Sequence, residues 1–334
     1  MTENCDQEIK CVFENIQGIT TDQAFYKRVY ELILSCLRKN KKFWSKIGSF
    51  LKGITLEEIG LEGTIKFGDK KEVDFLEEIN HLIPQLKDTK VILFLDELPE
   101  VLHNLYKNKK SDQASGIIKN LRKWRQKEQF GSLCFVLAGS VGIHHVVKTI
   151  EGRTSDLNDQ YKIDFEDLGS TEANEYVTWA TRNATVQYDE PLKTYLLQKI
   201  AHHIPYFINL MLDQIHKTAK KNRNPTITNV DVDDAFNKIV KNSDHFKDWR
   251  NRLVDYYEPN VAKFLDEILI YIAHYEEINK LKLYDTARKF KLSNDCIDLM
   301  DGLEKDGYIV ERNDIYHFVS PFLQSYWKRY NLPK

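Results

Sequence analysis

The first half of the chain alternates short apolar runs with amphipathic stretches, and this alternation is the feature that most restricts its fold. The runs of strand length are Ile9 to Phe13, Val91 to Leu95, Leu133 to Ala138 and Tyr161 to Phe165. Three of them are rich in Val, Ile, Leu and Phe, as strands covered on both faces are. Strands separated by helical stretches are typical of a parallel sheet joined by crossover helices. We therefore predict an α/β fold.

The stretches between these runs carry apolar residues at helical spacing. The longest, Thr21 to Asn40, has Asp22 in its first turn and basic residues in its last turn, as the helix dipole favours. The residues from Phe43 to Lys71 follow neither the helical nor the strand period. The stretch GTIKFGDKKE, Gly63 to Glu72, predicts a short hairpin on the surface.

The remaining chain predicts two further domains after a first domain of residues 1–166. Residues 167–245 show only helical patterns, with Ser170 as a predicted N-cap, a break near Pro205 and a capping-box spacing at Thr228 and Asp231. We expect a helical domain there. Residues 246–334 predict three helices, then two strands joined by a two-residue turn, then a helix, which is the order of a winged helix-turn-helix.

Composition excludes several classes of protein. The 334 residues are 42% hydrophobic and 29% charged with a formal charge of −2, so no overall field attracts nucleic acid or an anionic membrane. No stretch reaches the ~18 apolar residues that span a bilayer. The cysteines lack a C-x-x-C pair, which favours reduced thiols and a cytoplasmic location. They are Cys5, Cys11, Cys36, Cys134 and Cys296.

Two acidic residues end the second predicted strand, in VILFLDELPEVL. At such a position in nucleotide-hydrolysing enzymes, an Asp holds Mg²⁺ through water and a following Glu accepts a proton from the attacking water. Asp96 and Glu97 have this order. The next strand ends in Gly139 and Ser140, where a small residue and a hydroxyl suit a contact with a γ-phosphate. Acids and Gly-Ser pairs also simply terminate strands, so the pattern alone leaves both interpretations open.

The loop that should cradle the phosphates is missing from the sequence. That loop reads G-x-x-x-x-G-K-[ST], because glycines let backbone N–H groups surround the anion and the lysine adds a positive charge. None of the 14 glycines is followed by lysine.

From Cys11 to its end the chain resembles the archaeal-type P-loop ATPases, close to the AAA+ and STAND switch proteins. The resemblance lies in CVFENIQGITTDQAFYKRVYELI, in the Walker B stretch VILFLDELPEVL, in LCFVLAGSVGIHHVV and in the C-terminal SPFLQSYWKRY. It implies an ATP-binding switch with ATP and Mg²⁺ as cofactors. It also implies that Asp96 positions Mg²⁺, that Gly139 and Ser140 lie at the nucleotide, and that Arg153 reaches a γ-phosphate from a neighbouring subunit or domain. A solvated loop arginine is the alternative for Arg153.

The chain departs from that family at its start, where the family has a first strand and the phosphate-binding loop. Two explanations compete: the chain is an N-terminal truncation, or it is a divergent member that has lost nucleotide binding. We favour truncation, since losing an interior strand would leave strand edges unpaired. We expect no ATP hydrolysis by the chain as given. The alternative function is a non-catalytic scaffold on a degenerate ATPase core.

The C-terminal domain raises the question of DNA binding, which its charge disfavours. In its predicted recognition helix, Asn294 to Gly307, the buried stripe is Cys296, Leu299, Met300 and Leu303, and the outward positions carry five acids against one lysine. Phosphates would be repelled. We therefore predict contacts with a protein partner or with the protein's own domains, and leave oligomerisation open. The basic stretch LRKWRQK (Leu121 to Lys127) and the pairs His144-His145 and His202-His203 are interpreted as structural.

Overall fold

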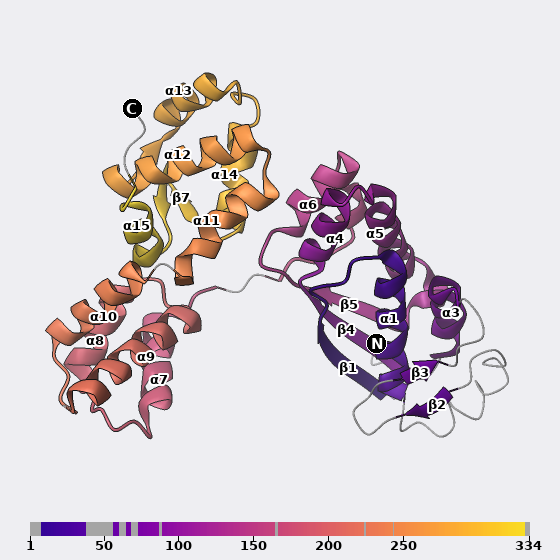
Figure 1. The fold of residues 1–334 in the computed structure, drawn as a ribbon, viewed down its shortest axis with the longest axis horizontal. Coiled ribbons are helices and arrows are strands. Elements are labelled where there is room, and N and C mark those ends of the chain that lie inside the picture. The colour runs from indigo at the N-terminus through magenta and orange to yellow at the C-terminus, as the bar shows by residue number, and fades with distance from the viewer. Residues whose placement is uncertain are drawn as a thin grey trace, which may run out of the picture. The chain divides into compact units, whose positions relative to one another are not determined.

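The structure is a computed structural model. It describes residues 8–37, 56–59, 65–67, 73–86, 89–163, 166–223, 225–242 and 244–330. The chain divides into two compact units, Met1–Tyr161 and Lys162–Lys334, and each is described by itself (Figure 1).

The first unit is an α/β unit. Its elements are β1 (Glu8–Asn15), α1 (Asp22–Leu37), β2 (Leu56–Ile59), β3 (Ile65–Phe67), α3 (Phe75–Leu82), η1 (Ile83–Leu86), β4 (Thr89–Asp96), α4 (Leu98–Lys107), α5 (Ser111–Gln126), η2 (Glu128–Phe130), β5 (Leu133–Leu137), α6 (Ile143–Glu151) and η3 (Ser155–Leu157). Strands β1, β4 and β5 form a parallel sheet in the order β1-β4-β5. The predicted α/β fold and its first three strands are confirmed.

Burial along β4 shows which face of the sheet belongs to the core. Its residues alternate between buried and partly exposed, and Val91, Leu93 and Leu95 are at most 1% exposed. Because side chains of a strand alternate between faces, these three point into one apolar core. On the same face, the indole of Trp124 in α5 stacks on the ring of Phe135 in β5, with centroids 6.0 Å apart.

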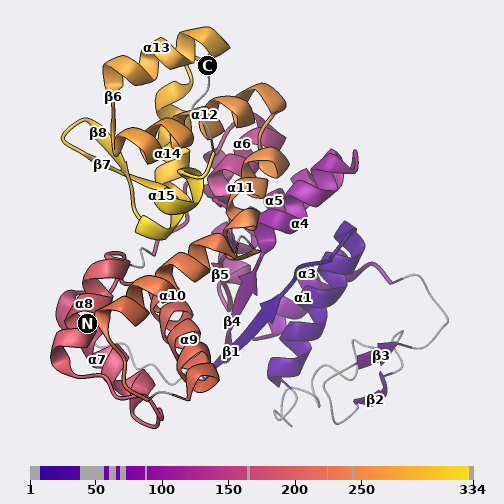
Figure 2. The same ribbon diagram turned by 60° about the vertical axis from the view of Figure 1, so that its left-hand side comes forward.

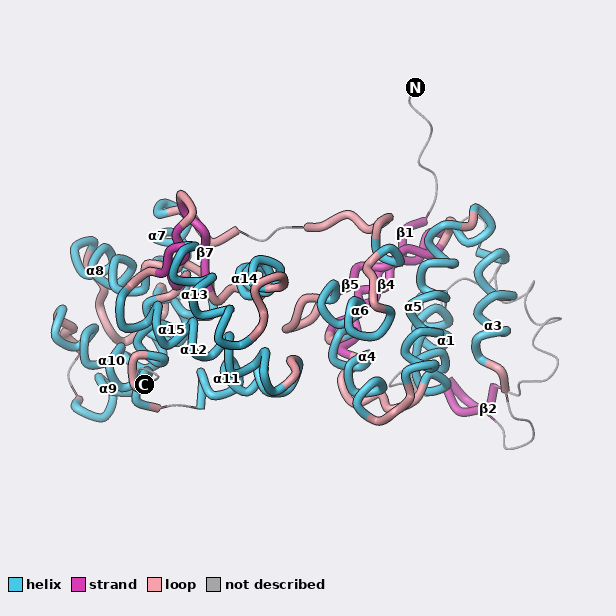
Figure 3. Tube along the Cα trace, turned by 90° about the horizontal axis from the view of Figure 1, so that it is seen from above, coloured by secondary structure: helices cyan, strands magenta, loops and turns pink. Residues whose placement is uncertain are grey.

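The helices α1, α3, α4 and α5 lie on one side of this sheet (Figures 2 and 3). Their placement follows from the path of the chain, which crosses from β1 to β4 to β5 always in the same direction. Crossovers between parallel strands are right-handed, so connections that progress in one direction place their helices on the same face. The described helices of this unit therefore cover one face.

Two predictions in the first unit need correction. Residues 161–163 form no strand, and Tyr161 is 94% exposed, so the predicted fourth strand is wrong for these residues; residues 164 and 165 lie outside the described part. The predicted hairpin is partly right: β3 pairs antiparallel with β2, but β2 begins at Leu56, well before Gly63.

The second unit is mostly helical. Its elements are α7 (Ser170–Thr181), α8 (Glu190–Ile200), α9 (Pro205–Asn222), α10 (Asn229–Lys241), α11 (Asp244–Tyr256), α12 (Pro259–Tyr275), β6 (Ile278–Asn279), α13 (Lys280–Phe290), α14 (Cys296–Lys305), β7 (Ile309–Arg312), β8 (Ile315–Phe318) and α15 (Pro321–Trp327).

Local signals set several helix ends in this unit. The break near Pro205 is confirmed, since α8 ends at Ile200 and the proline opens α9. The capping box is confirmed, with the N–H of Thr228 donating to Asp231 Oδ2 at 2.9 Å. The N-cap of α7 is Gly169, one residue before the predicted Ser170.

A small antiparallel sheet completes the second unit. Its order is β6-β8-β7, and β7 and β8 are joined by Asn313 and Asp314. Both turn residues have positive φ, 52° and 64°, which is the geometry of a type I′ turn. The predicted hairpin is therefore confirmed. The two-residue strand β6 is too short to leave a sequence pattern.

One hydrophobic core runs through the whole second unit. The ring of Phe322 in α15 stacks on Phe207 of α9, Phe236 of α10 and Phe246 of α11, with centroids 5.2, 4.5 and 5.9 Å apart. The helices of residues 167–245 and the C-terminal segment therefore share one core, in which Phe322 contacts both.

Among the described residues, no helix has the length and apolarity that crossing a bilayer requires. The described cysteines, Cys11, Cys36, Cys134 and Cys296, are free thiols, as predicted; Cys5 lies outside the described part.

Candidate functional site

The predicted acid pair lies at the carboxyl end of the central strand. Asp96 is the last residue of β4, and Glu97 occupies the N-cap position of α4. Glu97 has φ 63° and ψ 26°, in the left-handed region that non-glycine residues rarely adopt. Such a conformation costs roughly 1–3 kcal/mol and is common at functional sites. The surrounding structure therefore holds Glu97 in a strained position.

This conformation brings the carboxylate of Glu97 to the end of the neighbouring strand. Ser140, three residues beyond β5, donates to Glu97 Oε2 from its hydroxyl at 3.1 Å and from its backbone N–H at 3.2 Å. The Glu97 side chain makes no capping hydrogen bond to its own helix. Two of the residues that the sequence singled out, Glu97 and Ser140, therefore lie in direct contact.

Asp96 is fixed mainly through its backbone. Its carbonyl accepts from the N–H of Ile16 at 3.1 Å, and its Oδ1 accepts from the N–H of Glu97 at 3.0 Å. The side chain is partly exposed. In the described part of the chain, no group of three or more His, Cys, Asp or Glu side chains could hold a metal by itself. Mg²⁺ bound with nucleotide uses one or two carboxylates and phosphate oxygens, so a single carboxylate fits that kind of site.

Gly139 has a packing reason for lacking a side chain. A Cβ atom there would lie 2.6 Å from Cδ of Pro99, the second residue of α4. The glycine thus lets the start of α4 press against the end of β5. This close approach helps to bring Glu97 within reach of Ser140.

Arg153 is not joined to these residues by any hydrogen bond or ion pair that the described residues make. Its guanidinium lies 3.8 Å from Asp156, and its side chain is 65% exposed. Asp156 also binds Arg122, at 2.9 Å. The arginine predicted to contact a γ-phosphate therefore lies in a loop of paired charges in its own chain.

The stretch LRKWRQK packs against its own unit. Trp124 is fully buried and donates to Asn80 Oδ1 at 2.9 Å. Arg122 and Arg125 pair with Asp156 and Asp159. These basic side chains are therefore engaged within the first unit. In the second unit, His203 Nε2 lies 3.0 Å from the carbonyl of Leu197, and burial lowers the pKa of His202.

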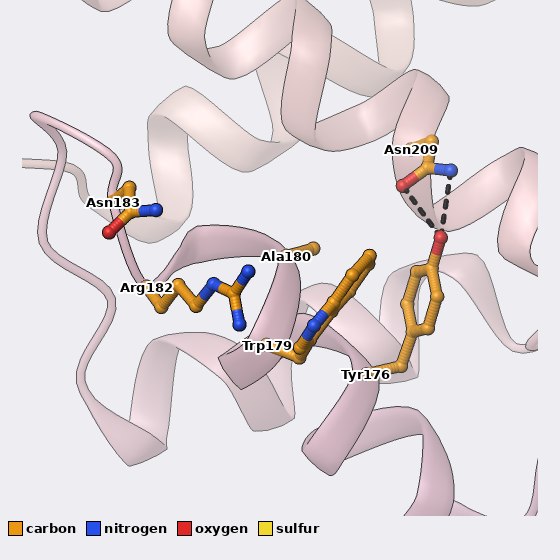
Figure 4. Close-up of a pocket in the computed structure, with 6 residues that line it drawn as sticks. All are labelled: Tyr176, Trp179, Ala180, Arg182, Asn183 and Asn209. Carbon is orange, nitrogen blue, oxygen red and sulfur yellow. Dashed lines mark hydrogen bonds between the residues drawn. The ribbon is translucent and has the colours of Figure 1, made fainter.

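A pocket of about 420 Å³ in the second unit was not predicted (Figure 4). Its lining includes Trp179, 57% exposed, with the guanidinium of Arg182 5.5 Å from the indole centroid. Tyr176 and Asn209 close one side and hydrogen bond to each other, at 2.9 and 3.1 Å. Its only sequence signal is Trp and Arg three residues apart on a helix. The pocket contains none of the predicted site residues.

Comparisons with known proteins place the fold. No family model matches the chain, and no curated protein matches it. Among solved structures, a Walker-type ATPase of Pyrococcus abyssi superposes with a TM-score of 0.58 and 16% identity, over 96% of this chain and 84% of its own. The ORC2 protein of Aeropyrum pernix, in complexes with ADPNP and ADP, gives 0.53 and 10%, over 96% and 77%. At these identities the likeness shows the fold, an α/β fold of the kind found in P-loop ATPases.

Proposed function

We propose that this chain carries the acid pair and the nucleotide-responsive part of an ATP-dependent molecular switch of the AAA+/STAND type. The observation that carries the proposal is the contact of Glu97 with Ser140 at the carboxyl edge of a parallel sheet. In open α/β sheets ligands bind outside the carboxyl ends of the strands. The strain at Glu97 and the fold shared with nucleotide-bound structures support the same assignment.

Each site residue then has a distinct role. Asp96 would hold Mg²⁺ through a bound water, and Glu97 would accept the proton of the attacking water. Ser140 would sense the γ-phosphate, because its hydroxyl and N–H would donate to phosphate oxygens instead of to Glu97. That exchange would free the Glu97 carboxylate only when nucleotide is present. ATP supplies the phosphoryl group that is transferred to water.

The phosphate cradle must come from outside these 334 residues. We call it the loop unit: a strand, then a G-x-x-x-x-G-K-[ST] loop, then a helix. Without it the site offers a polyphosphate the hydroxyl and N–H of Ser140 beside two carboxylates, so the chain should neither bind ATP tightly nor hydrolyse it.

The test is equilibrium binding of a fluorescent ATP analogue with Mg²⁺, with and without an added loop unit. The expected result is no saturable binding by the chain alone and micromolar binding once the loop unit is present. Ser140→Ala should weaken the ATP analogue more than the ADP analogue, because only ATP has the phosphate that Ser140 contacts. Tight binding by the chain alone, or equal loss for both nucleotides, would refute these assignments. An in-frame loop unit in the genome upstream of Met1 would support the switch over the scaffold.

We propose that residues 246–334 are a winged helix that contacts protein rather than DNA. Helix α14 has Cys296, Met300 and Leu303 buried, and its charged residues are three acids, Asp298, Asp301 and Glu304, against Lys305. Lys280 at the start of α13 is already paired with Glu311 and Asp314. A salt-sensitive shift of duplex DNA in an electrophoretic assay would contradict this.

The helices of residues 167–245 form the lid in this proposal. Because Phe322 joins the lid and the winged helix in one core, the two should move as a single body when nucleotide binds. Arg153 is proposed to act on the nucleotide of a neighbouring subunit, which its 65% exposure would permit.

A further inference from the structure

The pocket beside α7 plays no part in the proposed nucleotide chemistry and has the size of a small binding site. Tyr176, Trp179 and Ala180 lie three or four residues apart on α7, so their side chains share one face of that helix. Asn209 of α9 contacts Tyr176 and lines the same space (Figure 4). Because Ala180 has only a methyl group, its larger neighbours surround an open volume of about 420 Å³. Ligand pockets typically have volumes of roughly 300–1,000 Å³.

One wall of this pocket is already in place without a ligand. The Tyr176 hydroxyl and the Asn209 amide hydrogen bond to each other, so α7 and α9 are tied together there. The Tyr176 ring lies 5.7 Å from the indole of Trp179, centroid to centroid. In Figure 4 the indole stands between this ring and the guanidinium of Arg182. A preformed aromatic surface loses little conformational entropy when a ligand binds to it.

The other wall carries hydrogen-bond donors that no described residue uses. Within the described ranges, the guanidinium of Arg182 forms no ion pair, and the indole N–H of Trp179 and the side-chain amide of Asn183 form no hydrogen bond. The contact with the indole gives the guanidinium no oxygen acceptor. All three residues are exposed, so a ligand can reach them. A planar guanidinium pairs with a carboxylate through two parallel hydrogen bonds.

The charges around the pocket favour a ligand with one carboxylate over a polyanion. Arg182 is the charged residue of the lining. The charged residues of α7 itself are both acidic, Glu172 and Glu175. A nucleic acid strand presents a row of phosphates, which several cations must neutralise. A single carboxylate needs only the guanidinium.

The pocket also suits part of a longer chain better than a free metabolite. A pocket for a small molecule buries about 70–90% of the ligand's surface. Here Trp179 and Arg182 are exposed, so the pocket is open to solvent on their side. Trp, Tyr and Arg are the residue types that most often anchor contacts between proteins. A linear peptide offers an aromatic side chain, a carboxylate and backbone amides close together.

We propose that this pocket is the docking site for a linear peptide of a partner protein that carries an aromatic residue next to Asp or Glu. The aromatic ring packs on the indole of Trp179 above Ala180, and the neighbouring carboxylate accepts from the guanidinium of Arg182. Asn183, whose amide both donates and accepts, hydrogen bonds to the peptide backbone. The peptide site is independent of the proposed function, because none of these residues belongs to the nucleotide site.

The experiment selects peptides and then measures their binding. Random peptides displayed on phage are panned against the immobilised full chain in the presence of excess soluble Trp179→Ala chain, which removes peptides that bind elsewhere. Recovered sequences are synthesised with a fluorescent label and an amidated C-terminus, and their binding is followed by fluorescence anisotropy. We expect them to share an aromatic residue beside Asp or Glu. Replacing that acid by its amide should weaken binding at least tenfold, because charge-assisted hydrogen bonds are lost.

Matched variants test the pocket itself. Arg182→Gln should weaken binding of the same peptides at least tenfold, and Arg182→Lys should recover only part of this loss, because lysine keeps the charge without the planar fork. The control is Arg223→Gln, which should leave the affinity unchanged. Arg223 is exposed and is the C-cap residue of α9, as Arg182 is of α7. The indole N–H signal of Trp179, assigned in NMR spectra by its absence in Trp179→Phe, should shift during the titration.

Several results would overturn the peptide site. They are recovery of no binding peptide, recovered peptides without the acid, equal binding to the wild type and Arg182→Gln, and no shift of the Trp179 signal. A labelled oligothymidylate that binds the wild type but not Arg182→Gln would assign the pocket to single-stranded nucleic acid instead. If circular dichroism shows that Trp179→Ala does not fold, the selection is run without a competitor and the NMR shift identifies the pocket binders. All measurements are made without nucleotide, so their outcome does not depend on the proposed ATP switch.

Discussion

Replacing Phe322 by alanine tests whether the second unit is one cooperative body. The side chain is fully buried, and its ring stacks on Phe207, Phe236 and Phe246. A buried Phe→Ala change costs about 3–5 kcal/mol from lost transfer energy and the cavity left behind. For a body of ~150–250 residues each kcal/mol lowers the Tm by about 2–4 °C, so the shift should be on the order of 10 °C.

The assay is urea unfolding followed by tryptophan fluorescence, with calorimetry to count transitions. The matched control is Tyr206→Ala, since Tyr206 is next to Phe207 in sequence but is 47% exposed. The control should cost less than about 1 kcal/mol. The reasoning is refuted if Phe322→Ala costs no more than the control, or if residues 167–245 and the C-terminal segment of the wild type unfold in separate transitions.

Three further predictions concern local structure and pH. Gly139→Ala should destabilise the first unit by about 1–3 kcal/mol, because the added methyl would lie 2.6 Å from a proline ring carbon. The control is Gly116→Ala inside α5, where the added Cβ would lie 3.8 Å from its nearest atom; it should stabilise the unit by roughly 0.5–1 kcal/mol in the same denaturation assay. Asp314→Gly should raise the stability of the second unit, since glycine adopts the positive φ of a type I′ turn without strain. This gain of ~0.5–1 kcal/mol should exceed the loss of the exposed ion pair between Asp314 and Lys280; an unchanged urea midpoint would contradict this. Burial lowers the pKa of His202 and of His216, so the unfolded chain binds more protons than the folded one once the pH falls below ~6.5. The free energy of unfolding should therefore be highest above about pH 7 and decline toward pH 5. His202→Phe should reduce that decline, measured by urea titrations at each pH.

Much of the fold could be predicted, because its strands and turns depend on residues that are neighbours in the sequence. The apolar runs at Ile9, Val91 and Leu133 became the sheet, because a strand buried on at least one face needs such a run. The turn at Asn313 and Asp314 was predictable because few residues tolerate two successive positive φ angles.

The features that the sequence analysis did not predict depend on contacts between residues that are far apart in the chain. Nothing at Glu97 predicts its left-handed conformation, which the packing of α4 and the contact with Ser140 impose. The apolar run starting at Tyr161 has the composition of a strand, yet no described strand lies beside it to pair with. The shared core around Phe322 joins helices that sequence analysis had assigned to two domains. The sequences of these helices show only that each helix has a buried face.

The central claim is that Asp96, Glu97 and Ser140 are the hydrolytic side of a nucleotide pocket. The most direct measurement is phosphate release from Mg-ATP by the chain supplied with the loop unit, in the wild type and in Glu97→Gln. We expect turnover to fall about 100-fold or more in the variant, because the general base is lost. Equal rates in the two proteins would contradict it.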